Sequence, residues 1–202
     1  RARTPAMTRP PLPRTVWVLG IVSLLTDVSS ELVHALLPLL LAGPIGASML
    51  MIGLIEGAAE AMAAIVKLFS GALSDRIGRR KPLVVAGYAL SALTKLVFPL
   101  AHGAGFILGA RLVDRVGKGI RGAPRDALIA DVTPVDQRGA AYGLRQSLDT
   151  IGGVLGPLAA IGLMLWLADA RLALWLAAIP GAAAVLVLIV YVREPERQID
   201  SA

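Results

Sequence analysis

Three titratable residues lie at helical spacing near the start of the chain, inside an otherwise apolar stretch. On an α-helix, Asp27, Glu31 and His34 fall within about 60° of one another. Inside a membrane such a charge costs ~2.5–3.5 kcal/mol on insertion scales unless it has a partner, water or a proton. No Lys or Arg accompanies them in residues 15–42. The pattern favours Asp27 and Glu31 as groups that bind a substrate or carry protons.

Charges recur on one helical face in three further apolar stretches. They are Glu56, Glu60 and Lys67 in the first, Arg111, Asp114, Arg115 and Lys118 in the second, and Arg145 and Asp149 in the third. Polar faces on four helices predict a bundle around a water-filled cavity. The candidate substrate and proton residues are Asp27, Glu31, His34, Glu56, Glu60, Arg111, Asp114 and Arg115.

Some of these charges have a structural alternative. Asp114/Lys118 and Arg145/Asp149 are pairs four residues apart, so their members could neutralise each other along one helix. For these two pairs, local pairing and use in a cavity both stay open. Lys95 is the only charge within its own stretch, which otherwise looks suited to contact lipid.

Six apolar stretches must position these residues. The chain of 202 residues is 56% hydrophobic and only 17% charged, against about 25% charged residues in ordinary soluble domains. We therefore predict an all-α membrane protein with six transmembrane helices of about 20 residues or more. The expected spans are 15–42, 49–74, 82–101, 105–130, 139–167 and 172–192, with tails at 1–14 and 193–202.

The connectors predict the topology. Lys and Arg concentrate in the two tails and in the links after the second and fourth spans, whereas Arg171 is the only basic residue of the other three links. By the positive-inside rule both tails are cytoplasmic. We expect an integral protein of a bacterial inner (plasma) membrane that contacts the lipid bilayer.

Other classes of protein are disfavoured. The chain has no Cys, and it shows neither a phosphate-binding loop nor a nucleophile beside a base, so we expect no enzyme and no cofactor. Its net charge of +6 resides mostly in the connectors, and only three Phe, three Tyr and three Trp are available for base stacking. We therefore expect no nucleic-acid partner.

The link between the second and third spans carries a specific motif. Residues 71–83 read GALSDRIGRRKPL, which resembles the G-x-L-x-D-R-x-G-R-[RK]-x-x-L cytoplasmic loop of the major facilitator superfamily. The resemblance implies the N-terminal six-helix half of that fold, built from two inverted three-helix repeats. It also implies a gating loop that latches the two halves together. The residues that carry this motif are Gly71, Asp75, Arg76, Gly78, Arg79 and Arg80.

Two weaker matches lie in later spans. Gly152, Gly156 and Pro157 resemble the G-x-x-x-G-P-x-x-G-G segment of the superfamily's drug/proton antiporters, although 160–161 read Ala-Ile. The structural alternative is close helix packing with a proline kink. In the fourth span Arg111 is placed as in the pattern R-x-x-Q-G-x-G, but the first glycine falls two positions late.

These features lead to three hypotheses about function. The first is secondary active transport, in which a small molecule leaves the cell by alternating access in exchange for protons taken up by Asp27 or Glu31. The second is export of a divalent metal ion held by Asp27, Glu31 and His34, whose oxygen and imidazole donors suit such an ion. The third is a half-sized membrane partner without transport activity. Any transport role requires a second six-helix half: a companion chain, a missing C-terminal half or a second copy.

Overall fold

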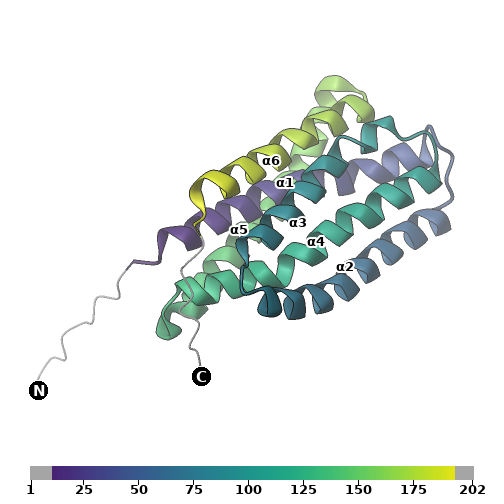
Figure 1. Ribbon diagram of the computed structural model, residues 1–202. Helices are drawn as coiled ribbons and strands as arrows, with labels where there is room; N and C mark the ends of the chain where they lie inside the picture. The colour runs from purple at the N-terminus through teal and green to yellow at the C-terminus, as the bar shows by residue number, and fades with distance from the viewer. Residues whose placement is uncertain (1–10, 194–202) are drawn as a thin grey trace, which may run out of the picture.

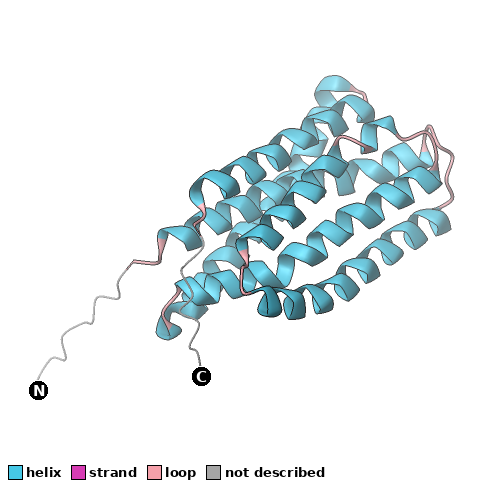
Figure 2. Ribbon diagram, in the orientation of Figure 1, coloured by secondary structure: helices cyan, strands magenta, loops and turns pink. Residues whose placement is uncertain are grey.

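The chain folds into a bundle of six long helices. The computed structural model describes residues 11–193, which contain α-helices, two short 3₁₀ turns and no strand (Figures 1 and 2). The helices are α1 (Arg14–Ala42), α2 (Met49–Ile77), α3 (Lys81–Lys95), α4 (Ala104–Val132), α5 (Arg138–Leu167) and α6 (Ala170–Tyr191). The 3₁₀ turns are Phe98–Leu100 and Val135–Gln137. The all-α fold with six helices agrees with the prediction from the sequence.

The third helix is shorter than expected. The sequence predicts one continuous span over 82–101, but α3 ends at Lys95 and a 3₁₀ turn follows at Phe98–Leu100. Pro99 explains the break, because it lacks an amide hydrogen and disfavours the α conformation in the residue before it. The α-helix and the turn together are still long and apolar enough to cross a membrane.

Helix α4 differs from the other five in composition. The segments Arg14–Ala42, Met49–Ile77, Lys81–Leu100, Val135–Leu167 and Ala170–Tyr191 have the length and apolarity of membrane spans. α4 has 29 residues, as many as α1 and α2, but a stripe of charged side chains makes it the least apolar of the six helices. It runs through the bundle between α2 and α3 (Figure 1). Arg111, Asp114, Arg115 and Arg121 of this stripe are buried.

The pattern of helix contacts reveals two inverted repeats. α1 packs mainly against α5 and α6, while α4 packs mainly against α2 and α3, and α3 also packs against α6. Exchanging α1–α3 with α4–α6 leaves this set of contacts unchanged. Because α1 and α4 start at opposite ends of the bundle, the two repeats have opposite directions (Figure 1). This is the inverted-repeat arrangement predicted from the sequence.

Glycines let the helices approach closely. A Cβ atom built on Gly156 of α5 would lie 2.6 Å from Cβ of Glu31 and 3.0 Å from the amide nitrogen of Leu32, both in α1. In the equivalent interface of the other repeat, a Cβ on Gly119 of α4 would lie 2.6 Å from Cβ of Val66 in α2. Inside a membrane the hydrophobic effect does not drive helices together, so close van der Waals packing of this kind holds them in contact.

A buried ion pair joins α3 to α4. Lys95, with 1% of its surface exposed, places Nζ 2.6 Å from Oδ1 of Asp114. Arg111 and Arg115 approach the other carboxylate oxygen at 3.8 and 4.0 Å. The sequence suggested Lys118 as the partner of Asp114, but Lys118 pairs with Glu60 at 3.6 Å. Asp114 faces α3, where Lys95 is its closest cation and both members of the pair are buried.

We expect Gly156→Ala to lower the stability of the bundle by about 1–3 kcal/mol, because the added methyl group meets the backbone of α1. Gly162→Ala, on the same helix with nothing within 4 Å of the added carbon, is the matched control and should be neutral or slightly stabilising. Thermal unfolding in detergent measures both. Equal unfolding midpoints for the two variants would contradict the packing role of Gly156.

We expect Lys95→Met to destabilise the protein by about 3–5 kcal/mol, since it leaves the Asp114 carboxylate buried without its closest cation. Lys118→Met removes a half-exposed partner of Glu60 and should change stability by less than about 1 kcal/mol. Adding Asp114→Leu to Lys95→Met should recover part of the loss. A Lys95→Met protein as stable as Lys118→Met would show that the pair does not hold α3 to α4.

Candidate functional site

A charged cavity of about 550 Å³ lies between α1, α2, α4 and α5. Neither α3 nor α6 contributes a residue to its wall. These are the four helices that the sequence predicts around a cavity, and they include both central helices of the bundle. The charged residues of the wall are Asp27, Glu31, Glu60, Lys67, Lys118, Arg121, Arg125, Asp126, Arg145 and Asp149.

One side of the cavity is internally neutralised. Nη1 of Arg145 lies 3.0 Å from Oδ1 of Asp126, and its Nη2 lies 2.9 Å from Oδ2 of Asp149. Nε of Arg125 approaches the same Asp126 oxygen at 3.2 Å. The local pair Arg145/Asp149, one of the two alternatives from the sequence, is therefore present. It also lines the cavity, so pairing and a place in the wall are compatible.

The α1 side of the cavity carries free carboxylates. Within residues 11–193, neither Asp27 nor Glu31 has an ion pair or a hydrogen bond to its side chain. The backbone of α5 presses against the base of both side chains through Gly152 and Gly156, where added Cβ atoms would lie 2.9 and 2.6 Å from their Cβ atoms. α5 thus offers these acids no cation at the point of closest approach.

Two arginines of the wall were missed by sequence reasoning. Arg121 and Arg125 look like connector residues that set topology, yet both lie inside α4. Arg121 is buried, donates from Nη1 to Oγ of Ser91 at 2.6 Å, and stacks over the ring of Tyr88 at 4.6 Å. Arg121 follows Lys118 by three residues and Arg125 follows Arg121 by four, so both continue the charged stripe of α4, and this signal could have identified them.

Three of the candidate residues form a separate cluster outside the cavity wall. Nε of Arg111 donates to Oε1 of Glu56 at 3.0 Å, and Nη2 of Arg111 lies 3.1 Å from Nδ1 of His34. The same Nδ1 of His34 lies 3.3 Å from Oε2 of Glu56. This outer cluster joins α1, α2 and α4 near the end of the bundle opposite the described termini. Asp114 extends it toward α3 through Arg111.

Arg115 connects the outer cluster to the cavity. Its Nη1 lies 3.0 Å from Oε1 of Glu60, which is itself a residue of the cavity wall. Of the eight candidate residues, the structure therefore places Asp27, Glu31 and Glu60 in the wall and the others beside or beyond it. Arg111 and Asp114, two candidates from the sequence, lie outside the wall and form ion pairs with Glu56 and Lys95 instead.

The metal-binding alternative does not fit this geometry. In the part of the chain that the structure describes, no three His, Asp or Glu side chains converge in a way that could hold a metal ion. His34 shares a helical face with Asp27 and Glu31, but its Nδ1 turns toward Glu56 and Arg111. The guanidinium of Arg111 beside the imidazole also repels a second cation.

The gating-loop residues form a tight turn tied to α4. Gly78 adopts a positive φ of 70° and caps α2, with its amide donating to the carbonyl of Ser74. Nε of Arg80 lies 2.7 Å from Oδ2 of Asp131, near the end of α4. Asp75 is farther from Arg80, at 3.7 Å, and its side chain is 70% exposed. Asp131 was missed because the loop motif does not specify residues on α4.

Sequence comparisons place the chain in one family. The family model of the Major Facilitator Superfamily matches residues 19–202. An uncharacterized MFS-type transporter of Methanocaldococcus jannaschii is 37% identical over 157 residues, which cover 77% of this chain and 39% of that protein. An uncharacterized protein of Mycobacterium tuberculosis is 35% identical over 90% of this chain and 45% of its own length. The quinolone resistance protein NorA of Staphylococcus aureus is 25% identical over 74% of the chain.

Solved structures share the fold. A bacterial homolog of the human lysosomal transporter Spinster, inward-facing and unoccupied, superposes with a TM-score of 0.78 over 91% of this chain and 43% of its own, at 20% identity. A peptide transporter superposes with the same TM-score over 88% and 38%, at 18% identity. The chain therefore spans less than half the length of these relatives, and its six helices correspond to the N-terminal half of their fold. By its sequence and its fold, this integral membrane protein belongs to the major facilitator superfamily of transporters.

Proposed function

We propose that this chain forms half of a secondary active transporter that exports a small molecule in exchange for protons. The observation that carries the proposal is the pair of free carboxylates, Asp27 and Glu31, in the wall of a charged cavity. A cavity of about 550 Å³ is in the size range of sites for small molecules. The name of the quinolone resistance protein NorA, a more distant relative, is consistent with export.

The chemistry of exchange follows from the lack of a contacting cation at Asp27 and Glu31, since Lys118, Arg121 and Arg125 line the same cavity but form no ion pair with either acid. A carboxylate that no cation neutralises can become neutral by taking up a proton, or it can bind a cationic group of a substrate. The two events compete for the same oxygens, so protonation favours release of the substrate. Competition of this kind is what couples a proton to a substrate moving in the opposite direction.

Alternating access requires a second unit of similar size. A half-bundle on its own would turn the charged cavity toward lipid at a prohibitive cost. The curated relatives are more than twice as long as the aligned segments, which supports a second six-helix half as the partner. A companion chain, a C-terminal half of a longer chain or a second copy would each supply it, and substrate would move as the two halves rock against each other.

The loop after α2 suits a latch between these halves. Arg80 is anchored to Asp131 within this chain, whereas the carboxylate of Asp75 remains mostly exposed at the same end of the bundle. An exposed acid on a rigid turn can accept hydrogen bonds from a neighbouring unit in one conformation and lose them in the other. We assign Asp75 to this contact.

We expect Asp27→Asn with Glu31→Gln to abolish substrate-driven proton movement, because neither amide can exchange a proton. The complete transporter is isolated from its membrane and reconstituted in proteoliposomes. The internal pH is then recorded after quinolones and other organic solutes are added one at a time. Asp136→Asn is the control, since Asp136 is an exposed acid outside the cavity. If the double variant keeps the parental ratio of protons to substrate, the assignment is wrong. A folded parent that moves no solute of a broad panel would instead favour the non-transporting partner.

We expect Asp75→Asn to slow transport several-fold at matched insertion, because a lost latch shifts the balance of conformations without unfolding the bundle. Asp131→Asn should in addition lower the thermal unfolding midpoint, since it breaks the 2.7 Å pair with Arg80. Initial uptake rates and unfolding midpoints separate the two effects. Parental rates in Asp75→Asn would show that this carboxylate is not part of a gate.

A further inference from the structure

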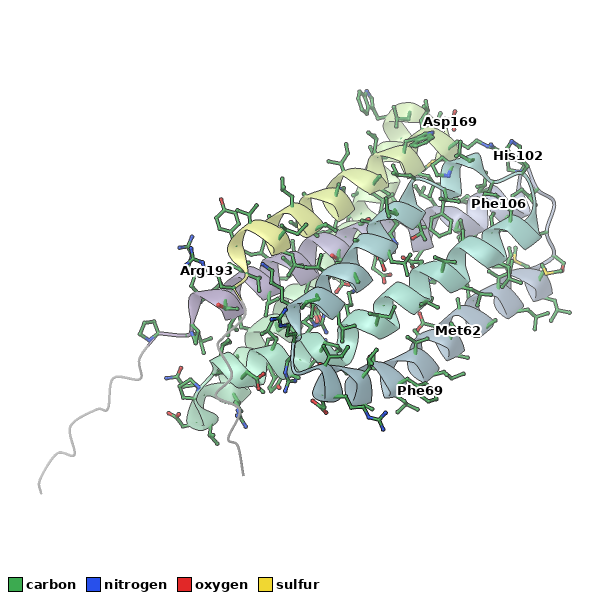
Figure 3. All side chains as sticks on the ribbon, viewed as in Figure 1. Met62, Phe69, His102, Phe106, Asp169 and Arg193 are labelled. Atoms are coloured by element: carbon green, nitrogen blue, oxygen red, sulfur yellow. The ribbon has the colours of Figure 1, made fainter. Side chains whose placement is uncertain are left out.

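A second hollow lies far from the cavity, where α1 begins and α6 ends. It has a volume of about 500 Å³ and is lined by Arg14, Thr15, Val190, Tyr191 and Arg193. Two of these five residues are cationic, two carry hydroxyl groups and none is acidic. Figure 3 shows Arg193 at this end of the bundle, beside the first turn of α1. By the predicted topology this is the cytoplasmic end.

The two arginines of the hollow differ from five arginines that form ion pairs within the bundle. Arg14 and Arg193 are exposed and have no carboxylate partner among residues 11–193; Arg14 rests over the ring of Tyr191 at 5.9 Å. Five other arginines each lie within 4.0 Å of a carboxylate, namely Arg80, Arg111, Arg115, Arg125 and Arg145. The hollow therefore presents two guanidinium groups whose hydrogen-bond donors are available to an anion.

An apolar strip continues from the hollow along both helices. Trp17 and Ile21 follow Arg14 at three and seven residues, which places them on the same face of α1. Leu186 and Val190 precede Arg193 by seven and three residues on α6. All four side chains are well exposed. A cationic end, an aromatic belt of Trp and Tyr, and an apolar strip follow the order of polarity in one leaflet of a bilayer.

The inverted repeat shows that helix packing does not require these cations. The equivalent place in the other repeat is where α4 begins and α3 ends, at the opposite end of the bundle. There Lys95 is buried against Asp114, and the nearby Arg171 donates to the carbonyl oxygens of Pro99 and Ala101. Neither cation is free. Within residues 11–193, the same architecture thus packs with its basic residues satisfied at one end and with two that have no carboxylate partner at the other.

We propose that this hollow is a binding site for an anionic phospholipid, with the phosphate held between Arg14 and Arg193 and an acyl chain along the apolar strip. Guanidinium groups match phosphate geometry through paired hydrogen bonds. The hydroxyl groups of Thr15 and Tyr191 add donors at the same level. The site does not depend on the substrate, the coupling ion or the direction of transport.

The test measures lipid binding by the complete protein, purified from its membrane in detergent together with any partner it has there. Native mass spectrometry records the bound lipid while phosphatidylglycerol is titrated in. Each contact with a basic residue near a membrane surface contributes ~1 kcal/mol, so Arg14→Gln or Arg193→Gln should weaken binding about fivefold. The two changes together should weaken it by about twentyfold or more. Arg14→Lys and Arg193→Lys should retain more of the affinity.

Controls separate a built site from general attraction. Arg76→Gln removes an exposed arginine that does not line this hollow, and it should leave phosphatidylglycerol binding unchanged. Phosphatidylcholine should bind more weakly, and inorganic phosphate should not compete at equal concentration because it lacks the acyl chain. Parental affinity in the double Gln variant overturns the proposal, as does an equal loss in Arg76→Gln. Full competition by inorganic phosphate would assign the site to a free anion instead of a lipid. Unfolding midpoints confirm that each variant is folded.

Discussion

The need to neutralise charge inside an apolar bundle governs how this protein is built. α4 lies at the centre of the bundle and carries cations along much of its length. Without partners, these charges would be too costly to bury inside a membrane. Carboxylates of α2 make it possible, since Glu56 meets Arg111 and Glu60 meets Arg115. In the opposite sense, Asp114 of α4 meets Lys95 of α3. Each pair fixes the depth and the rotation of a helix, so the electrostatics of α4 also determine where α2 and α3 lie.

The free carboxylates of the cavity arise from a difference between two equivalent interfaces. In the inverted repeat, the contact of α1 with α5 corresponds to that of α4 with α2. The second contact combines glycine packing with acid–base pairs, whereas the first brings Gly152 and Gly156 against Asp27 and Glu31. α5 carries its cation, Arg145, nearer the other end, where Asp126 and Asp149 already neutralise it. Among the described residues, the α1 acids are therefore left without an ion pair, although Lys118, Arg121 and Arg125 line the same cavity.

The sequence predicts the elements better than their partners. Hydropathy and helical spacing were sufficient for the six helices and for the four helices around the cavity, whereas the inverted repeats were implied by the family resemblance of the loop at 71–83. They could not place His34, because a helical face does not say which neighbour lies against it, and here that neighbour is Arg111 of α4. The sequence also could not predict that Lys95 is buried in an ion pair, because its partner Asp114 lies on another helix and the surrounding stretch looks suited to contact lipid. The role of Asp131 as the partner of Arg80 became visible only in the folded structure, because the two residues lie about 50 positions apart in the sequence.

The ties between α2 and α4 also constrain how any movement can occur. Arg111 holds Glu56 toward one end, close packing at Gly119 joins the middle, and Arg80 beside the first turn of α3 holds Asp131 at the other end. Sliding α2 along α4 would break buried ion pairs and force Val66 past a glycine sized for it, and each step leaves uncompensated charge in an apolar setting. Small residues and ion pairs thus hold α2 and α4 in one register. If a second six-helix half covers the open face of the cavity, as we propose, the moving interface lies outside this bundle, on the side where Asp27 and Glu31 have no ion pair.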